Sequence, residues 1–177
     1  MDPGRLVFVD ESSTNVAMVP RYARAPKGVR AYGKAPRNWG RNVTLISSVT
    51  LAGMGPSMSI EGSADGESFG LYLKKVLCPS LKRGQIVVMD NLSVHKGKSV
   101  REQIEARGCE LWFLPAYSPD LNPIEEAFSK AKGALKRAKA RTLEALFEAT
   151  ARALDAVGAE DARGFFGHCG YAAPQAH

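Results

Sequence analysis

The 177-residue chain is 45% hydrophobic and 24% charged, which are values of a globular domain, and its net charge of +6 permits a polyanionic partner. Its three cysteines lie far apart, which argues against a disulfide framework or a zinc site and favours a reducing compartment. No basic-then-apolar leader opens the chain, and no apolar run approaches eighteen residues, so we expect one cytoplasmic domain over residues 1–177.

A buried strand is predicted over residues 6–9, where four apolar residues are followed by an acid, Asp10. A continuous apolar run of this kind is typical of a strand covered on both faces. Glu11 is the rival acid. Successive side chains of a strand point to opposite faces, so we expect Glu11 to point away from Asp10 and to play at most a supporting role.

A basic stretch follows, and no Asp or Glu occurs between Ser12 and Ile60. Its cations are Arg21, Arg24, Lys27, Arg30, Lys34, Arg37 and Arg41. Aromatic residues alternate with them, which favours contact with DNA phosphates and stacking on bases, although a solvated basic surface is the common alternative. Because the stretch follows the Asp10 strand closely, it can lie near that acid.

The next part of the chain predicts two more strands and a helix. The β-branched run at 42–51 and the weaker run at 57–60 complete an antiparallel meander with the first strand. A helix is predicted over residues 68–77, because apolar residues recur there with helical spacing and indicate a side that faces the core.

A second acid follows a second buried strand. Residues 86–89 repeat the pattern of the first strand and lead into Asp90 and Asn91, although an Asp-Asn pair alone is typical of a turn. His95 lies five residues after Asp90, where a lone histidine is more often a surface or capping residue than a ligand. Lys96 is close to the same loop and is a candidate for phosphate contact.

The third acid lies at a predicted helix start, after a helix over 97–107 and a strand over 110–114. Asn122 suits the N-cap, Pro123 the first helical position and Glu125 the third. Glu125 has a structural alternative as the reciprocal partner of Asn122 in a capping box.

The apolar arc of this helix separates Glu125 from Glu126. At 100° per residue Glu126 lies nearly opposite the arc and is expected in solvent, whereas Glu125 lies at its edge, within reach of a strand end. Lys132 and Lys136 share the side of Glu125, either as part of the basic surface or as a solvated face. One more amphipathic helix is predicted within 143–157, before a short aromatic tail at 164–177.

Two strands that end in carboxylates and a helix that begins with one can gather three acids at the carboxyl ends of a sheet. Ligand sites of open α/β sheets lie at those ends. Three carboxylates repel one another, and a hard divalent cation such as Mg²⁺ is the usual remedy.

Asp10, Asp90 and Glu125 resemble the acids of the DDE transposases of the mariner superfamily, in particular its bacterial insertion-sequence branch. Thirty-four residues separate Asp90 from Glu125, a spacing typical of that superfamily, and the string Ser-Pro-Asp-Leu-Asn-Pro-Ile-Glu that ends at Glu125 is specific. The resemblance covers nearly the whole chain, up to Gly170 and Tyr171.

The resemblance implies an α/β, ribonuclease-H-like fold with a mixed sheet of about five strands flanked by helices. It implies that the three acids bind two Mg²⁺ (or Mn²⁺) ions, with Asn91, His95 and Asn122 in support. The implied reaction is cleavage at transposon ends, followed by transfer of the 3′-OH into target DNA at TA.

The resemblance also implies partners, namely double-stranded DNA and a second copy of the chain. No helix-turn-helix pattern precedes Asp10, although family members read their element ends with such domains. We therefore expect a catalytic fragment, a relic, or one product of a split gene whose other frame encodes the helix-turn-helix, located at the nucleoid. An inactive DNA-binding remnant and a nuclease that cleaves without strand transfer are the alternatives.

Overall fold

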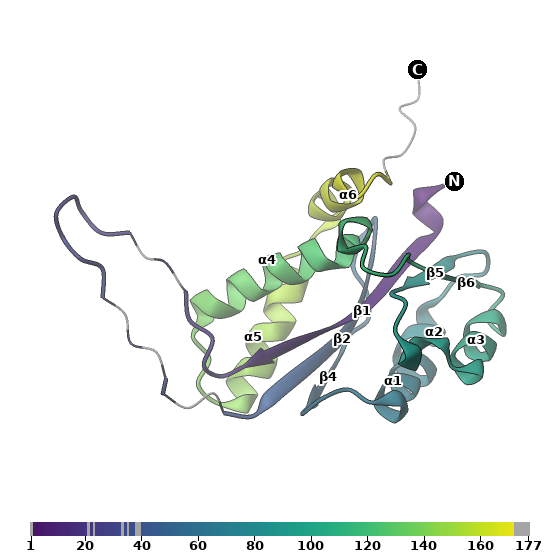
Figure 1. Cartoon of the computed structure of the whole chain (residues 1–177), viewed down its shortest axis with the longest axis horizontal. Helices are drawn as coiled ribbons and strands as arrows, with labels where there is room; N and C mark the ends of the chain where they lie inside the picture. The colour runs from purple at the N-terminus through teal and green to yellow at the C-terminus, as the bar shows by residue number, and fades with distance from the viewer. Residues whose placement is uncertain are drawn as a thin grey trace, which may run out of the picture.

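A mixed sheet of six strands forms the centre of the computed structural model, which describes residues 2–20, 22, 24–32, 34, 36–37 and 40–171 (Figure 1). Arg21 of the basic stretch and residues 172–177 of the expected tail lie outside these residues. The strand order is β3-β2-β1-β5-β6, and β4 also pairs with β2. The strands are β1 (Leu6–Asn15), β2 (Asn42–Thr50), β3 (Gly53–Met54), β4 (Met58–Glu61), β5 (Ile86–Met89) and β6 (Glu110–Phe113).

The pairing of β1 confirms the predicted meander and corrects its first strand. β1 is antiparallel to β2, and β2 is antiparallel to β4, as expected. The prediction that the first strand ends before Asp10 is wrong, because β2 pairs with β1 as far as Asn15. Asp10 therefore lies within a strand, held by backbone hydrogen bonds along the sheet.

The helices flank the sheet, and most begin and end near their predicted positions. They are α1 (Gly66–Tyr72), which continues through the π-type turn η2 (Leu73–Leu77) into α2 (Cys78–Ser80), then α3 (Lys98–Glu105), α4 (Pro123–Ala138), α5 (Leu143–Asp155) and α6 (Ala159–His168). Short 3₁₀ turns are η1 (Pro3–Arg5), η3 (Ser93–Lys96) and η4 (Pro119–Leu121). Among the helices of the described residues, none is both long enough and apolar enough to cross a membrane.

Helix α6 corrects the predicted aromatic tail, because residues 164–168 belong to a helix. Asp161 accepts a hydrogen bond from the backbone N–H of Gly158 and thereby caps the helix start. Phe166 is buried against Phe8 of β1, with their ring centroids at 5.3 Å. The two glycines within this short helix weaken its sequence pattern, and packing on the sheet stabilises it instead.

Side chains of β1 alternate between two hydrophobic cores, one on each face of the sheet. Leu6 and Phe8 pack in the core formed with α4, α5 and α6, whereas Val7 and Val9 pack in the core formed with α1, η2 and α3. The same alternation places Asp10 on the α4 face and Glu11 on the α1 face.

The described part of the basic stretch projects away from the sheet, past the ends of α4 and α5 (Figure 1). The suggestion that it can lie near Asp10 is not borne out, because β1 continues for five residues beyond Asp10, roughly 16 Å at 3.3 Å per residue. Arg41 at its end forms an ion pair with Glu61 of β4. Glu61, which lies just after the segment without acids, therefore neutralises the charge of Arg41.

Candidate active site

Asp10 and Asp90 lie at the same edge of the sheet because the strand residues that precede them are parallel neighbours. Val9 of β1 is in register with Met89 of β5, so the next residue of each segment falls at the carboxyl end of that pair. The two acids also line the same cavity. Sheet pairing thus brings together two acids that are far apart in the sequence.

Asp10 is a buried carboxylate whose two oxygens each have a protein donor. Oδ1 accepts a hydrogen bond from the backbone N–H of Glu11 at 2.7 Å, and Oδ2 accepts one from Nδ2 of Asn122 at 2.8 Å. Burial raises the pKa of Asp10 to about 7; the hydrogen bond from Glu11 opposes this rise, and the negative charges of Glu125 and Asp90 add to it. Ionisation of Asp10 in the folded protein therefore costs free energy, and a bound cation would reduce that cost.

Asn122 orients Asp10, and the capping box considered for Asn122 and Glu125 is absent. Asn122 stands at the N-cap of α4, but its buried side chain makes no capping hydrogen bond and donates to Asp10 instead. Pro123 at the first helical position lacks an N–H, so the helix start has one donor fewer to satisfy.

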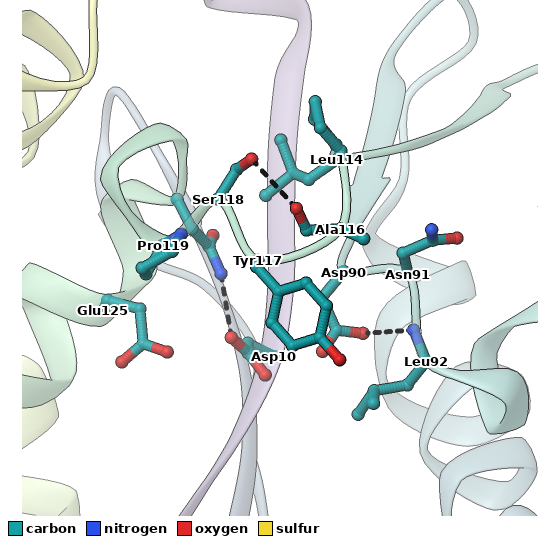
Figure 2. A pocket seen from close by; sticks show the side chains of 12 residues that line it. Asp10, Asp90, Asn91, Leu92, Leu114, Ala116, Tyr117, Ser118, Pro119 and Glu125 are labelled. Atoms are coloured by element: carbon teal, nitrogen blue, oxygen red, sulfur yellow. Dashed lines mark hydrogen bonds between the residues drawn. The ribbon is translucent and has the colours of Figure 1, made fainter.

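Glu125 reaches the same cavity from the start of α4 (Figure 2). The cavity has a volume of about 350 Å³, and Asp10, Asp90 and Glu125 all line it, together with Asn91. Glu125 is exposed, and its charge contributes to the raised pKa of Asp10. As the side chains stand, no three His, Cys, Asp or Glu of the described residues are grouped closely enough to hold a metal ion.

Glu126 does not line this cavity, and its side chain is 38% exposed, so the expectation that it lies in solvent holds in part. It is half-buried and pairs with Nδ1 of His168 on α6 at 3.1 Å. Glu126, His168 and Cys169 line a second, adjacent cavity, to which Asp120 and Glu125 also contribute. Glu125 lines both cavities, whereas Glu126 lines only the second, so of the two adjacent glutamates only Glu125 reaches Asp10 and Asp90.

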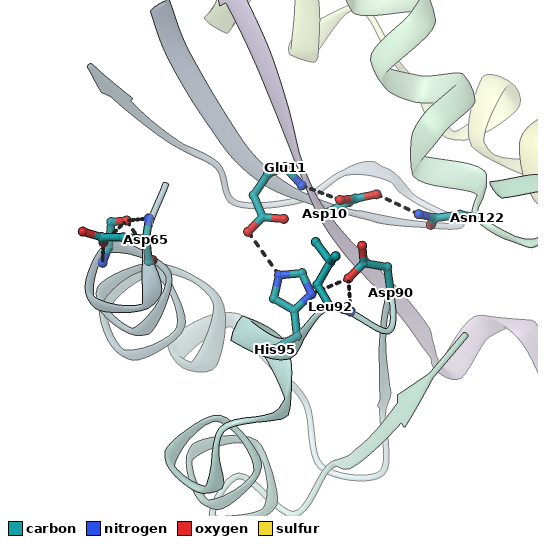
Figure 3. A network of polar contacts seen from close by, with 8 residues as sticks. Asp10, Glu11, Asp65, Asp90, Leu92, His95 and Asn122 are labelled. Carbon is teal, nitrogen blue, oxygen red and sulfur yellow. Dashed lines mark hydrogen bonds and ion pairs between the residues drawn. The ribbon is translucent and has the colours of Figure 1, made fainter. Parts of the chain in front are cut away.

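His95 connects Asp90 to Glu11 (Figure 3). Its fully buried ring places Nδ1 at 2.5 Å from Oδ1 of Asp90 and Nε2 at 3.1 Å from Oε1 of Glu11, and it packs on Phe69 with ring centroids 4.4 Å apart. Burial lowers the pKa of His95, but the two carboxylates outweigh burial and hold that pKa above its ordinary value.

The role of Glu11 in this network was not foreseen. The strand alternation correctly pointed Glu11 away from Asp10, but no local signal showed that η3 would bring His95 against it. Glu11 and Asp90 therefore share the His95 ring although they come from different segments of the chain.

Tyr171 is a second residue whose contact the sequence did not reveal. Its hydroxyl donates to the backbone oxygen of Leu121 at 2.9 Å, and its ring packs on Phe8 with centroids 5.0 Å apart. The end of the described chain thereby holds the η4 turn that leads into Asn122 and Glu125.

The predicted DNA-binding cations differ in exposure. Lys96 is exposed in η3, whereas Lys132 and Lys136 are half-buried along α4. Within the basic stretch, the guanidinium of Arg30 lies over the ring of Tyr32, 6.0 Å from its centroid. The described cations of that stretch are all exposed: Arg24, Lys27, Arg30, Lys34, Arg37 and Arg41.

The raised pKa of Asp10 predicts how the metal-free protein responds to pH. The unfolded value is 3.8 and the folded value is about 7, so between these pH values the folded state holds a proton that the unfolded chain releases. The contribution of Asp10 to folding is therefore fully present below pH 3.8 and is lost as pH rises through about 7, by up to about 1.4 kcal/mol for each pH unit.

We expect Asp10→Asn to remove this dependence. Without metal, its free energy of unfolding, measured by urea titration, should fall less than that of the wild type as pH rises through the range in which Asp10 titrates. The substituted amide can still pair with Asn122, whose own amide is free to flip. Parallel curves for the two proteins would contradict the assignment of the raised pKa to Asp10.

Comparison with known proteins gives matches to one family. The model of the DDE superfamily endonuclease family matches residues 5–147. The Tc1 transposable element transposase of Caenorhabditis elegans is 26% identical over 151 residues, which cover 80% of this chain and 55% of the relative.

Solved structures give the same fold. The Mos1 transposase paired-end complex with the left transposon end matches with a TM-score of 0.75 and 20% identity, and the Mos1 mariner paired-end complex with Mn matches with a TM-score of 0.69 and 20% identity. Each match covers 94% of this chain and 52% of the other. The expected ribonuclease-H-like fold is thereby confirmed, and the chain spans about half the length of these relatives.

Proposed function

Because this chain belongs to the DDE superfamily endonucleases, we propose that it is the catalytic part of a transposase that cleaves DNA at transposon ends and joins the freed 3′-OH to target DNA. The observation that carries the proposal is the cavity that Asp10, Asp90 and Glu125 share at the carboxyl ends of paired β1 and β5 residues. The names of the Tc1 and Mos1 relatives support the reaction, and TA is the proposed target.

The donor set fits hard divalent cations. All three side chains offer carboxylate oxygens, which Mg²⁺ and Mn²⁺ prefer, and the buried Asp10 carboxylate needs a positive charge to ionise at low cost. We assign two ions to Asp10, Asp90 and Glu125. When bound, such a pair activates the attacking oxygen and stabilises the leaving oxygen of an in-line displacement.

The surrounding residues hold these carboxylates in place. Asn122 fixes the direction of Asp10, because it donates to Oδ2 from a buried position. His95 and the backbone N–H of Leu92 both contact Oδ1 of Asp90, which leaves its second oxygen for a cation. Asp10 and Asp90 are thus preorganised, whereas the exposed Glu125 completes the site from the helix start.

Incubation with supercoiled plasmid that carries transposon ends tests the proposal, with Mg²⁺ or Mn²⁺ present or chelated. We expect metal-dependent cleavage at the ends and joined products, with a helix-turn-helix protein supplied to bring the ends together. Cleavage without joining would favour the nuclease alternative. Binding without either reaction would favour the inactive DNA-binding remnant.

The basic stretch is proposed to bind DNA phosphates. Removal of each phosphate contact should reduce the slope of log affinity against log salt by roughly 0.9. We therefore expect the triple change Arg24→Ala, Lys27→Ala and Arg30→Ala to flatten that slope without altering sequence preference, as measured by fluorescence anisotropy of labelled duplexes.

A matched control removes the same charge elsewhere. Lys74→Ala, Lys75→Ala and Lys82→Ala replace three exposed cations on the α1 side of the sheet. This variant should keep a slope close to that of the wild type. Equal slopes in all three proteins would mean that the basic stretch is only a solvated loop.

A further inference from the structure

Tyr117 combines two unusual properties at the active-site cavity. Its backbone has a φ of 58°, in the left-handed region that side chains other than Gly rarely adopt. Its side chain is fully exposed, although it lines the cavity that contains Asp10 and Asp90 (Figure 2). Backbone strain of this kind clusters at functional sites, and an exposed ring contributes little burial to offset it.

The cavity has two chemically different sides. The three carboxylates form one side, and the other consists largely of apolar residues: Leu92, Leu114, Pro115, Ala116, Tyr117 and Pro119. Leu92 is 52% exposed, so part of this side is open to a ligand. A phosphate group can bind to cations that the carboxylates hold, but it makes no favourable contact with an apolar and aromatic surface.

We propose that Tyr117 stacks on a nucleobase next to the scissile phosphate, held out of the duplex stack. This inference rests on the proposed function, which places a phosphodiester at the carboxylates. The groups nearest to that phosphate are sugars and bases, and the face of a base is the part that an aromatic ring recognises. In an intact duplex these faces are covered by neighbouring bases, so contact requires local unstacking.

Three substitutions at Tyr117 distinguish the contribution of the ring from those of the backbone strain and the hydroxyl group. Tyr117→Phe keeps the ring, Tyr117→Ala removes it, and Tyr117→Gly removes it while relieving the positive φ. We expect Phe to cleave like the wild type and both Ala and Gly to cleave about tenfold more slowly or worse. Because the side chain is exposed, thermal unfolding should show Ala folded and Gly at least as stable as the wild type.

A fluorescence measurement gives a readout that does not depend on cleavage. In metal-free protein, 2-aminopurine is placed at one position at a time within a short single-stranded gap at the cleavage position, where bases are already unstacked and the free probe is bright. Stacking on the ring should quench the probe at one position in the wild type and in Tyr117→Phe. The Ala and Gly variants should be brighter at that position.

The outcomes separate this inference from the proposed function. If the wild type cleaves but neither cleavage nor fluorescence responds to removal of the ring, the inference fails and the function stands. If ring-dependent quenching occurs without any cleavage, the function fails and the stacking contact stands. A Phe variant as slow as Ala, with unchanged fluorescence, would overturn the inference in favour of a hydroxyl contact to phosphate.

Discussion

Glu125→Gln is expected to abolish metal-dependent strand cleavage, whereas Glu126→Gln should stay within a few-fold of the wild type. Glu125 lines the cavity with Asp10 and Asp90, whereas Glu126 lines only the neighbouring cavity, which contains neither aspartate. Gln keeps the size of either side chain and removes only its charge. Removal of a metal ligand should lower the cleavage rate by at least about a hundredfold, as removal of a single group that stabilises developing charge does.

Thermal unfolding controls for damage to α4. The side chain of Asn122 does not cap this helix, so Glu125→Gln disturbs no capping box and should leave the melting temperature close to that of the wild type. Glu126→Gln can still accept a hydrogen bond from His168. Equal cleavage by the two variants would mean that the third ligand lies elsewhere, with Asp120 as the next candidate.

The register of α4 shows what the sequence can predict about this site. The apolar arc of the helix and the thirty-four-residue spacing both favoured Glu125, and the structure places that residue at the same cavity as the other two acids. Asp10 and Asp90 were expected together because a buried strand precedes each of them, and the parallel register of β1 and β5 brings them together.

Contacts between distant segments could not be predicted in the same way. Asn122 carries a strong local signal for capping, but its side chain is directed to Asp10 by the packing of α4 on the sheet. His95 joins Glu11 to Asp90 only because η3 folds against β1. Each of these contacts depends on the tertiary arrangement, and a local pattern describes only the nearest neighbours in the chain.

The length of β1 is a third example of this limit. The apolar run ends at Val9, so the predicted strand ended there as well. The polar residues that follow are nevertheless paired with β2, because backbone hydrogen bonds are indifferent to side-chain polarity. This extension carries the basic stretch away from Asp10.

Asp90→Asn is expected to weaken Mn²⁺ binding by more than about a hundredfold, because even residues that only orient metal ligands cost about 10–100-fold when they are replaced. Isothermal titration calorimetry measures this affinity. Asn can still accept the hydrogen bonds that Leu92 and His95 make to Oδ1 of Asp90, so the loop should keep its shape. The change therefore removes the negative charge and little else.

The matched control is Asp155→Asn, which removes an exposed acid at the end of α5 that does not line the cavity of Asp10 and Asp90. This variant should bind Mn²⁺ like the wild type. Without metal, Asp90→Asn should unfold at the same temperature as the wild type or a higher one, because the charge of Asp90 opposes ionisation of the buried Asp10. Unchanged Mn²⁺ affinity in Asp90→Asn would refute the assignment of the ions to these carboxylates, because loss of the negative charge of a true ligand must weaken metal binding.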